Sequence, residues 1–71
     1  MKVTKVTPNL MNILKQRGLT QSQLSEDSGV PQGTISRFDK NTRHESMHLF
    51  LISRSLGITI EELFVVEEQE E

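Results

Sequence analysis

The amino-acid sequence predicts an all-α fold, an orthogonal bundle of five short helices, with short β-strands possible at both ends of the chain. Three observations lead to this fold class. Apolar residues recur at helical spacing in successive short segments, Thr-x-x-Gln or Thr-x-x-Glu capping boxes open three of the segments, and a glycine ends three of them. With 71 residues, the chain has room for one small domain.

The first helix is expected to begin at Pro8, which suits a first helical position, with Thr7 as its cap, and to stop at Gly18. Its apolar positions are Leu10, Ile13 and Leu14. The preceding residues 1–7 alternate weakly between apolar and polar types, which is typical of a short strand or a loose arm.

The second helix is expected to open at a capping box formed by Thr20 and Gln23 and to end at Gly29. The third begins at Pro31 and ends at Asn41, a residue that adopts the left-handed conformation at low cost. The predicted buried positions of this pair of helices are Leu24, Ser28, Val30, Ile35 and Phe38.

The fourth helix is expected to open at a capping box of Thr42 and Glu45 and to stop at Gly57, and the fifth to open at Thr59 and Glu62. The residues predicted to lie inside the fourth are Met47, Phe50, Leu51, Ile52 and Leu56. Those predicted to be buried by the fifth are Ile60, Leu63 and Phe64.

The expected organisation is an arm or short strand over residues 1–7, the helical domain over 8–64, and a strand-like, acidic tail over 65–71. Valines at both ends suggest a two-stranded ribbon, within or between subunits, that would bury them and form a dimer contact; two frayed termini are the alternative. These valines are Val3, Val6, Val65 and Val66.

Composition excludes several classes of protein. The absence of cysteine rules out disulfides and thiolate zinc sites, and no apolar run approaches the roughly 20 residues of a membrane span. The first residues lack the apolar stretch of a secretory signal, so we expect a cytoplasmic protein. A chain this short has little room for the deep cleft of an enzyme, and we expect no catalytic residues and no cofactor.

Charge is distributed unevenly along the chain. Residues 1–43 carry seven Lys and Arg against three acids, a net charge of +4, whereas residues 44–71 carry one Arg against seven Glu, a net charge of −6. The overall charge of −2 therefore does not exclude a polyanionic partner, because the basic half can face it while the acidic tail points elsewhere.

Residues 21–38 have the layout of a helix-turn-helix, in which two short helices flank a three-residue turn. Gly29 makes the bend, and Val30 and Ile35 lock the second helix against the first. The outer face of the second helix is left polar, with Gln32, Thr34, Ser36 and Arg37.

The motifs around this segment resemble the Cro/cI phage-repressor (XRE) family over residues 8–64. They are Gly18-Leu19-Thr20-Gln21 leading to Leu24, then Thr34-Ile35-Ser36-Arg37-Phe38, and finally Leu56-Gly57 followed by Glu61-Glu62-Leu63-Phe64. Their order and spacing together are specific, whereas each alone is weak. The resemblance implies a lambda-repressor-like five-helix domain that binds operator DNA as a dimer.

The resemblance also assigns site residues. A recognition helix over about residues 32–39 would lie in the major groove, with base-facing positions at Gln32, Gly33, Thr34 and Arg37. Arg37 can pair with guanine, and Gln32 with adenine or a phosphate. Phosphate-contacting positions are Gln21, Ser22, Lys40, Asn41 and Arg43, and Lys2 and Lys5 could add an arm contact.

The chain departs from the family pattern at three positions. Gly33 carries no side chain where many relatives read a base. Leu14 stands where the family often has an Arg that pairs with an acid at the position of Asp39, so that this ion pair is absent. Ser46 stands where an apolar residue usually begins the fourth helix.

The sequence His44-Glu45-Ser46-Met47-His48 spells the H-E-x-x-H zincin motif, whose two histidines share one face of a helix. A catalytic zinc requires three protein ligands, and the chain has two histidines. We therefore interpret these residues as two exposed histidines at the start of a helix, and we expect no metal site.

Besides a zinc peptidase, which a metal assay showing no zinc would remove, two functions remain open at this point. The first is a sequence-specific DNA-binding transcriptional regulator, most simply a repressor, that binds a pseudo-palindromic operator in double-stranded DNA as a homodimer and has no membrane partner. The alternative is a protein-interaction module of the same fold, such as an antitoxin or adaptor, with weak DNA binding.

Overall fold

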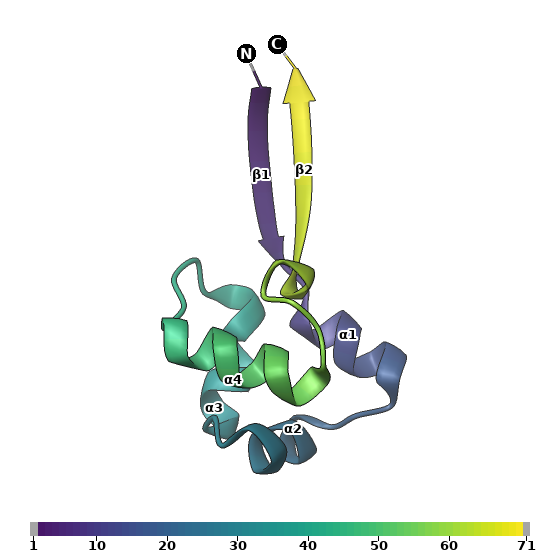
Figure 1. Cartoon of the computed structure of the whole chain (residues 1–71), viewed down its shortest axis with the longest axis vertical. Helices are drawn as coiled ribbons and strands as arrows, with labels where there is room; N and C mark the ends of the chain where they lie inside the picture. The colour runs from purple at the N-terminus through teal and green to yellow at the C-terminus, as the bar shows by residue number, and fades with distance from the viewer. Residues whose placement is uncertain (1, 71) are drawn as a thin grey trace.

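The computed structural model describes residues 2–70, with side chains described for residues 4–68. Over this range it has four α-helices, two 3-10 turns and one two-stranded sheet. In chain order these are β1 (Lys2–Pro8), α1 (Leu10–Arg17), α2 (Gln21–Ser28), α3 (Gln32–Arg37), η1 (Phe38–Lys40), α4 (Ser46–Leu56), η2 (Glu61–Leu63) and β2 (Phe64–Glu70). The helices gather in one body, from which the two strands project as a ribbon (Figure 1).

The core lies where the helices meet. Each helix and η2 contributes a side chain that is at most 1% exposed: Leu10, Leu24, Ile35, Ile52 and Leu63. Val30 and Phe38, just before and just after α3, are buried to the same degree. Helix α3 is therefore anchored at both of its ends.

The sequence predicts the start and end of α2 correctly. Thr20 Oγ1 accepts the Gln23 backbone N–H at 3.0 Å, and Gln23 Oε1 accepts the Thr20 N–H at 2.8 Å, which completes the capping box. Gly18, Gly29 and Gly57 end α1, α2 and α4, as expected.

Three predicted helix ends are wrong. Pro8 and Thr7 belong to β1, and α1 begins at Leu10 after Asn9. Asn41 is extended, with φ −87° and ψ 142°, and is not left-handed. The capping box of Thr42 does not form, because the chain stays non-helical up to Glu45, which becomes the N-cap of α4 without a side-chain capping bond.

The prediction of five helices is not confirmed. Thr59 and Glu62 do form reciprocal hydrogen bonds, from the Glu62 N–H to Thr59 Oγ1 (3.3 Å) and from the Thr59 N–H to Glu62 Oε1 (3.2 Å). They open only the single turn η2, because the β-branched Val65 and Val66 follow and pair with β1. Of the residues predicted to be buried here, Leu63 is buried, whereas Ile60 and Phe64 are half-buried.

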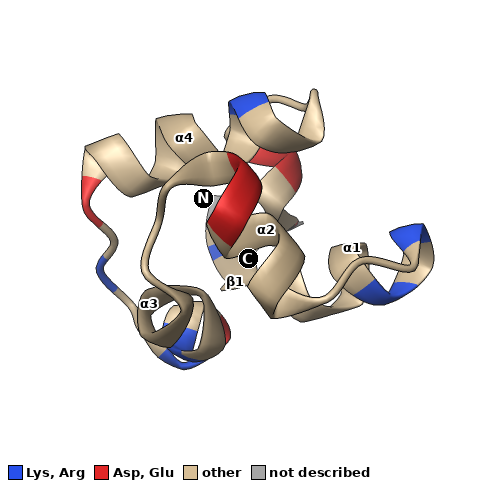
Figure 2. Cartoon of the chain, turned by 90° about the horizontal axis from the view of Figure 1, so that it is seen from below, with Lys and Arg blue, Asp and Glu red and all other residues tan. Residues whose placement is uncertain are grey.

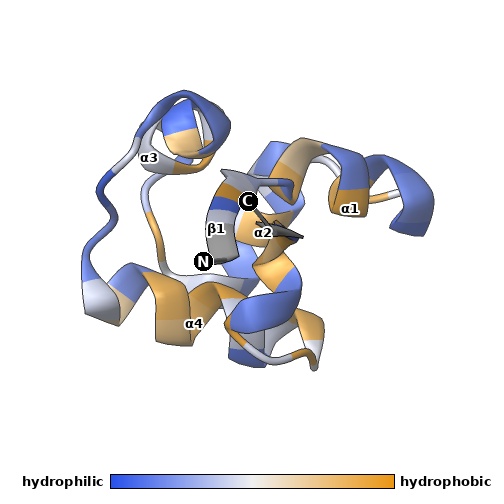
Figure 3. Ribbon diagram, turned by 90° about the horizontal axis from the view of Figure 1, so that it is seen from above, coloured by the Kyte–Doolittle hydropathy of each residue, from blue (hydrophilic) through white to orange (hydrophobic). Residues whose placement is uncertain are grey.

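The prediction that Met47, Phe50 and Leu51 lie inside is also wrong, since these side chains are 68%, 51% and 36% exposed. Helix α4 is hydrophobic along much of its length (Figure 3). Its inward face carries Ile52, Ser53 and Leu56. Because apolar residues occur on both faces, their spacing alone does not show which face turns inward.

The two ends of the described chain pair with each other in an antiparallel ribbon, from Lys2 opposite Glu70 to Pro8 opposite Phe64. The ribbon forms within one subunit, so residues 2–8 and 64–70 are not frayed. It does not bury the valines as expected, because Val6, Val65 and Val66 remain 55%, 42% and 44% exposed. The side chain of Val3 lies outside the described residues.

The helices within residues 2–70 are all too short, or too polar, to cross a membrane.

Candidate nucleic-acid interface

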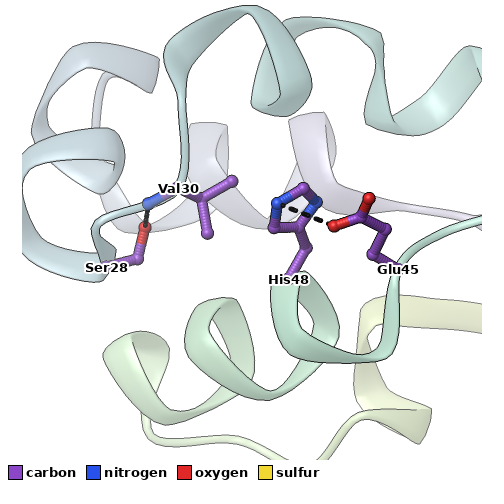
Figure 4. Close-up of polar contacts among 4 residues, drawn as sticks. All are labelled: Ser28, Val30, Glu45 and His48. Atoms are coloured by element: carbon purple, nitrogen blue, oxygen red, sulfur yellow. Dashed lines mark hydrogen bonds and ion pairs between the residues drawn. The ribbon is translucent and has the colours of Figure 1, made fainter.

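Hydrogen bonds within the chain hold the turn between α2 and α3. Gly29 adopts φ 81°, a left-handed conformation that costs glycine little. Ser28 Oγ accepts the Val30 N–H at 3.2 Å (Figure 4) and donates to the Leu24 carbonyl at 2.6 Å. Ser25 Oγ donates to the Val30 carbonyl at 2.7 Å. With its polar atoms satisfied and Val30 in the core, the turn sets the direction in which α3 leaves α2.

Helix α3 buries one face and exposes the other. Ile35 is fully buried, whereas Gln32, Gly33, Ser36 and Arg37 are exposed. At 100° per residue, these four exposed positions share one side of the helix. We call them the α3 face. The family resemblance does not include Ser36 among the base-facing positions. Its spacing of four residues from Gln32 is nevertheless enough to place it on the α3 face.

Thr34 is separated from the other predicted base-facing residues. It is half-buried and lines a hollow of about 170 Å³ between α3 and the start of α4. The other residues lining this hollow are Phe38, Asn41, Arg43, His44, Glu45 and His48. Three of the four predicted base-facing positions therefore lie together on the α3 face, and Thr34 lies beside it.

The predicted phosphate-contacting residues occupy two places. Gln21 and Ser22 form the first turn of α2, where Gln21 is half-buried and its Nε2 donates to Met11 Sδ at 3.2 Å. The exposed residues Lys40, Asn41 and Arg43 follow α3. Basic residues accordingly mark α3 and its connection to α4 (Figure 2).

The predicted arm contact lies elsewhere in the fold. Lys5 is on the ribbon, which projects from the end of the helical body opposite α2 (Figure 1). The side chain of Lys2 lies outside the described residues.

Asp39, which lies in η1 directly after α3, holds the start of α1. Its Oδ1 accepts the Leu10 N–H at 2.9 Å and its Oδ2 accepts the Met11 N–H at 3.1 Å. The first N–H groups of a helix have no partner within it, and a negative charge is favourable there. The family resemblance implies an Arg at the position of Leu14 as the partner of this acid; Leu14 is buried, and the carboxylate binds backbone donors instead.

The His-Glu pair does not have zincin geometry. Helix α4 begins at Ser46, so His44 precedes the helix and does not share a helical face with His48. The His44 Nε2 is 2.8 Å from the Phe38 carbonyl, and the His48 Nε2 is 3.4 Å from Glu45 Oε2 (Figure 4). The prediction that both histidines are exposed is wrong, because each is half-buried. Among the described residues, no group of three His, Cys, Asp or Glu side chains is placed to hold a metal.

The α3 face presents groups that suit the edges of base pairs. The amide of Gln32 can donate and accept together, as adenine requires, and the guanidinium of Arg37 offers the paired donors that guanine accepts. Within the described part of the chain, this guanidinium makes no hydrogen bond or ion pair, so its donors are available to a ligand.

Comparison with known proteins agrees with this arrangement. The family model of the Cro/C1-type HTH DNA-binding domain matches residues 9–69. The matched range includes all four helices, the turn and most of β2. Searches among curated proteins and among solved structures give no match.

Proposed function

The chain belongs to the Cro/C1-type helix-turn-helix DNA-binding family, and on this basis we propose that it is a sequence-specific transcriptional regulator, most simply a repressor. It acts in the cytoplasm, without enzymatic activity, as a homodimer on a pseudo-palindromic operator. Each subunit places α3 in the major groove, and the two recognition helices lie about one DNA turn, roughly 34 Å, apart.

The observation that carries this proposal is the exposed, polar α3 face on a helix whose opposite side is fixed in the core. Gln32 and Arg37 discriminate between bases from this face, and Thr34 reaches the groove from beside it. A helix held at both ends loses little freedom on binding, so more of the interaction energy is available for discrimination.

Affinity comes mainly from the residues on either side of the α3 face. These phosphate-contacting residues are Gln21, Ser22, Lys40, Asn41 and Arg43. Because such contacts release counterions, binding weakens steeply as salt concentration rises, and all comparisons between variants require one fixed salt concentration.

Arg37→Ala tests the proposal. Sites are first selected from random duplex DNA with the wild-type chain, and the affinity of each variant for the selected site is then measured by electrophoretic mobility shift. We expect Arg37→Ala to cost about 1–3 kcal/mol, or roughly 5- to 150-fold in Kd, and to relax the preference at one base position.

Lys15→Ala is the matched control, since it removes an exposed cation from α1 rather than from α3. We expect it to leave the base preferences unchanged. If Arg37→Ala binds as tightly as wild type, the role of Arg37 is refuted. If the wild-type chain selects no preferred sequence, the protein is not a sequence-specific regulator, and the interaction-module alternative is favoured.

We propose that the ribbon forms the dimer contact. Two strands alone are marginally stable in water, and no third strand pairs with either edge among the described residues. Val6 faces its partner Val66, and the two side chains are 55% and 44% exposed. A second copy would cover this apolar surface.

Val66→Lys should therefore shift the protein from dimer to monomer in analytical ultracentrifugation, because the contact would have to bury a charge. Phe50→Lys, on the exposed apolar side of α4, is the control and should leave the dimer intact. A Val66→Lys protein that stays fully dimeric would refute the ribbon contact, and loss of the dimer in Phe50→Lys alone would assign the contact to α4.

A further inference from the structure

We propose that Gly33 determines the DNA specificity of this protein by leaving room for the guanidinium of Arg37 on the α3 face. The inference rests on the proposed function and deepens it, because it concerns how the recognition helix presents its main base-reading group. Gly33 acts here as a positioning residue that does not itself need to touch a base.

The backbone conformation of Gly33 does not explain why a glycine is present. Gly18, Gly29 and Gly57 all have positive φ, the conformation that favours glycine, but Gly33 does not. It lies in the short helix α3, where glycine is about 1 kcal/mol less favourable than alanine. The reason for the lack of a long side chain at this position is therefore sought in the space around it.

That space is taken by Arg37. A Cβ built on Gly33 would lie 3.4 Å from Nη1, 3.5 Å from Nη2 and 3.8 Å from Cζ of Arg37. All three are guanidinium atoms, so the charged fork itself, and not only its aliphatic stem, lies over position 33. This follows from helix geometry, because residues four apart are neighbours and side chains lean toward the N-terminus.

Among the described residues, no acidic side chain pairs with the fork. Asp39, two residues further along the chain, is engaged by the N–H groups of Leu10 and Met11. Glu45 lies beside His48. Within the described residues, the guanidinium is thus positioned by the space over Gly33 and not by a hydrogen bond or ion pair. Its N–H donors are therefore free to pair with a base.

The distances also set a size limit at position 33. A separation of 3.4 Å is ordinary van der Waals contact, so the methyl group of an alanine fits beneath the fork. A longer side chain would occupy the volume that the fork now fills and would push it away. Alanine and glutamine, which both favour helix, therefore separate the effect of space from the effect of helix stability.

The experiment compares Gly33→Ala, Gly33→Gln, Arg37→Ala and the double variant Gly33→Gln/Arg37→Ala in the full chain. Base preferences are measured by selection from random duplex DNA, Kd is measured on the wild-type site at one salt concentration, and stability is measured by thermal unfolding. Both single changes at position 33 should raise the melting temperature, because each improves helix propensity.

We expect Gly33→Gln to bind roughly 5-fold or more weakly than wild type, and Gly33→Ala to lose less affinity than Gly33→Gln, because the alanine methyl group fits beneath the fork. Gly33→Gln should also relax the same base position as Arg37→Ala. In the Arg37→Ala background it should have no further effect, since the group it displaces is already gone.

The inference is overturned if Gly33→Gln keeps wild-type affinity and preferences, or if its effect simply adds to that of Arg37→Ala. Both results presuppose that Arg37→Ala itself weakens binding. If Arg37→Ala has no effect on binding, the proposed role of the α3 face is refuted, whatever Gly33→Gln does. Failure of the proposed function can therefore be told apart from failure of the inference about Gly33.

Discussion

Phe38→Ala is expected to lower the free energy of unfolding by about 3–5 kcal/mol, the largest effect of any change considered for this chain. The side chain is 1% exposed and lies directly after α3. Its ring centroid is 4.1 Å from that of His44 and 5.8 Å from that of Phe64. Removing it would leave a cavity where the end of α3, the connection to α4 and the base of the ribbon meet.

The loss would also disturb the backbone. His44 Nε2 is 2.8 Å from the Phe38 carbonyl, and contact between the two tilted rings keeps the imidazole in place. Small domains have total stabilities of about 5 kcal/mol at the low end of the usual range, so a large fraction of Phe38→Ala molecules should be unfolded at 37 °C. DNA binding should fall in parallel, because the α3 face depends on the fold.

Urea unfolding followed by circular dichroism measures this change, with Phe50→Ala as the control. Phe50 is 51% exposed on α4, so the same substitution removes an aromatic ring of the same size but loses much less buried area than Phe38→Ala. We expect a cost below about 1 kcal/mol for the control. Equal costs for the two variants would contradict the central position of Phe38.

Local chemistry explains which parts of the fold could be predicted from sequence. The capping box of Thr20 and the glycine at 29 act over three or four residues, and both occur where expected. The apolar residues of the helix-turn-helix could be identified because each has polar neighbours on the opposite face. The exposure of Gln32, Gly33 and Arg37 follows from the same pattern. Their contact with DNA stays a prediction.

Features that depend on distant parts of the chain could not be predicted in this way. Helix α4 is apolar on both sides, and only the packing of the other helices decides that Phe50 faces outward. The box of Thr59 and Glu62 forms, yet pairing of Val65 and Val66 with β1 prevents a full helix. The half-burial of Thr34 likewise depends on the path from α3 to α4.

The contact of Asp39 with α1 is the clearest case of a long-range effect, since it joins residues 29 and 28 positions apart. The family resemblance implies an Arg at the position of Leu14 as the ion-pair partner of this acid, and the chain has no Arg there. In the fold the carboxylate is instead the cap of α1, because Asn9 provides no side-chain capping bond. The acid thus has a structural role that does not need the arginine.

Asp39→Ala is accordingly expected to destabilise the fold by about 2–4 kcal/mol, since two hydrogen bonds to a charged acceptor are lost and the cap of α1 disappears. Asp39→Asn keeps one acceptor oxygen and should cost an intermediate amount. Asp27→Ala, on the exposed side of α2, removes an acid of the same type and should change stability by less than about 0.5 kcal/mol.

Urea unfolding ranks the three variants, and amide hydrogen exchange locates the effect. In Asp39→Ala the N–H groups of Leu10 and Met11 lose their acceptor. When the two proteins are compared under conditions that give them the same global free energy of unfolding, these N–H groups should exchange faster than in wild type, whereas the capped Gln23 N–H of α2 should not. Because Lys40 and Asn41 directly follow Asp39, a frayed α1 would also release the segment that we place on phosphates. An Asp39→Ala protein as stable as Asp27→Ala, with unchanged exchange at Leu10 and Met11, would show that the carboxylate does not cap α1.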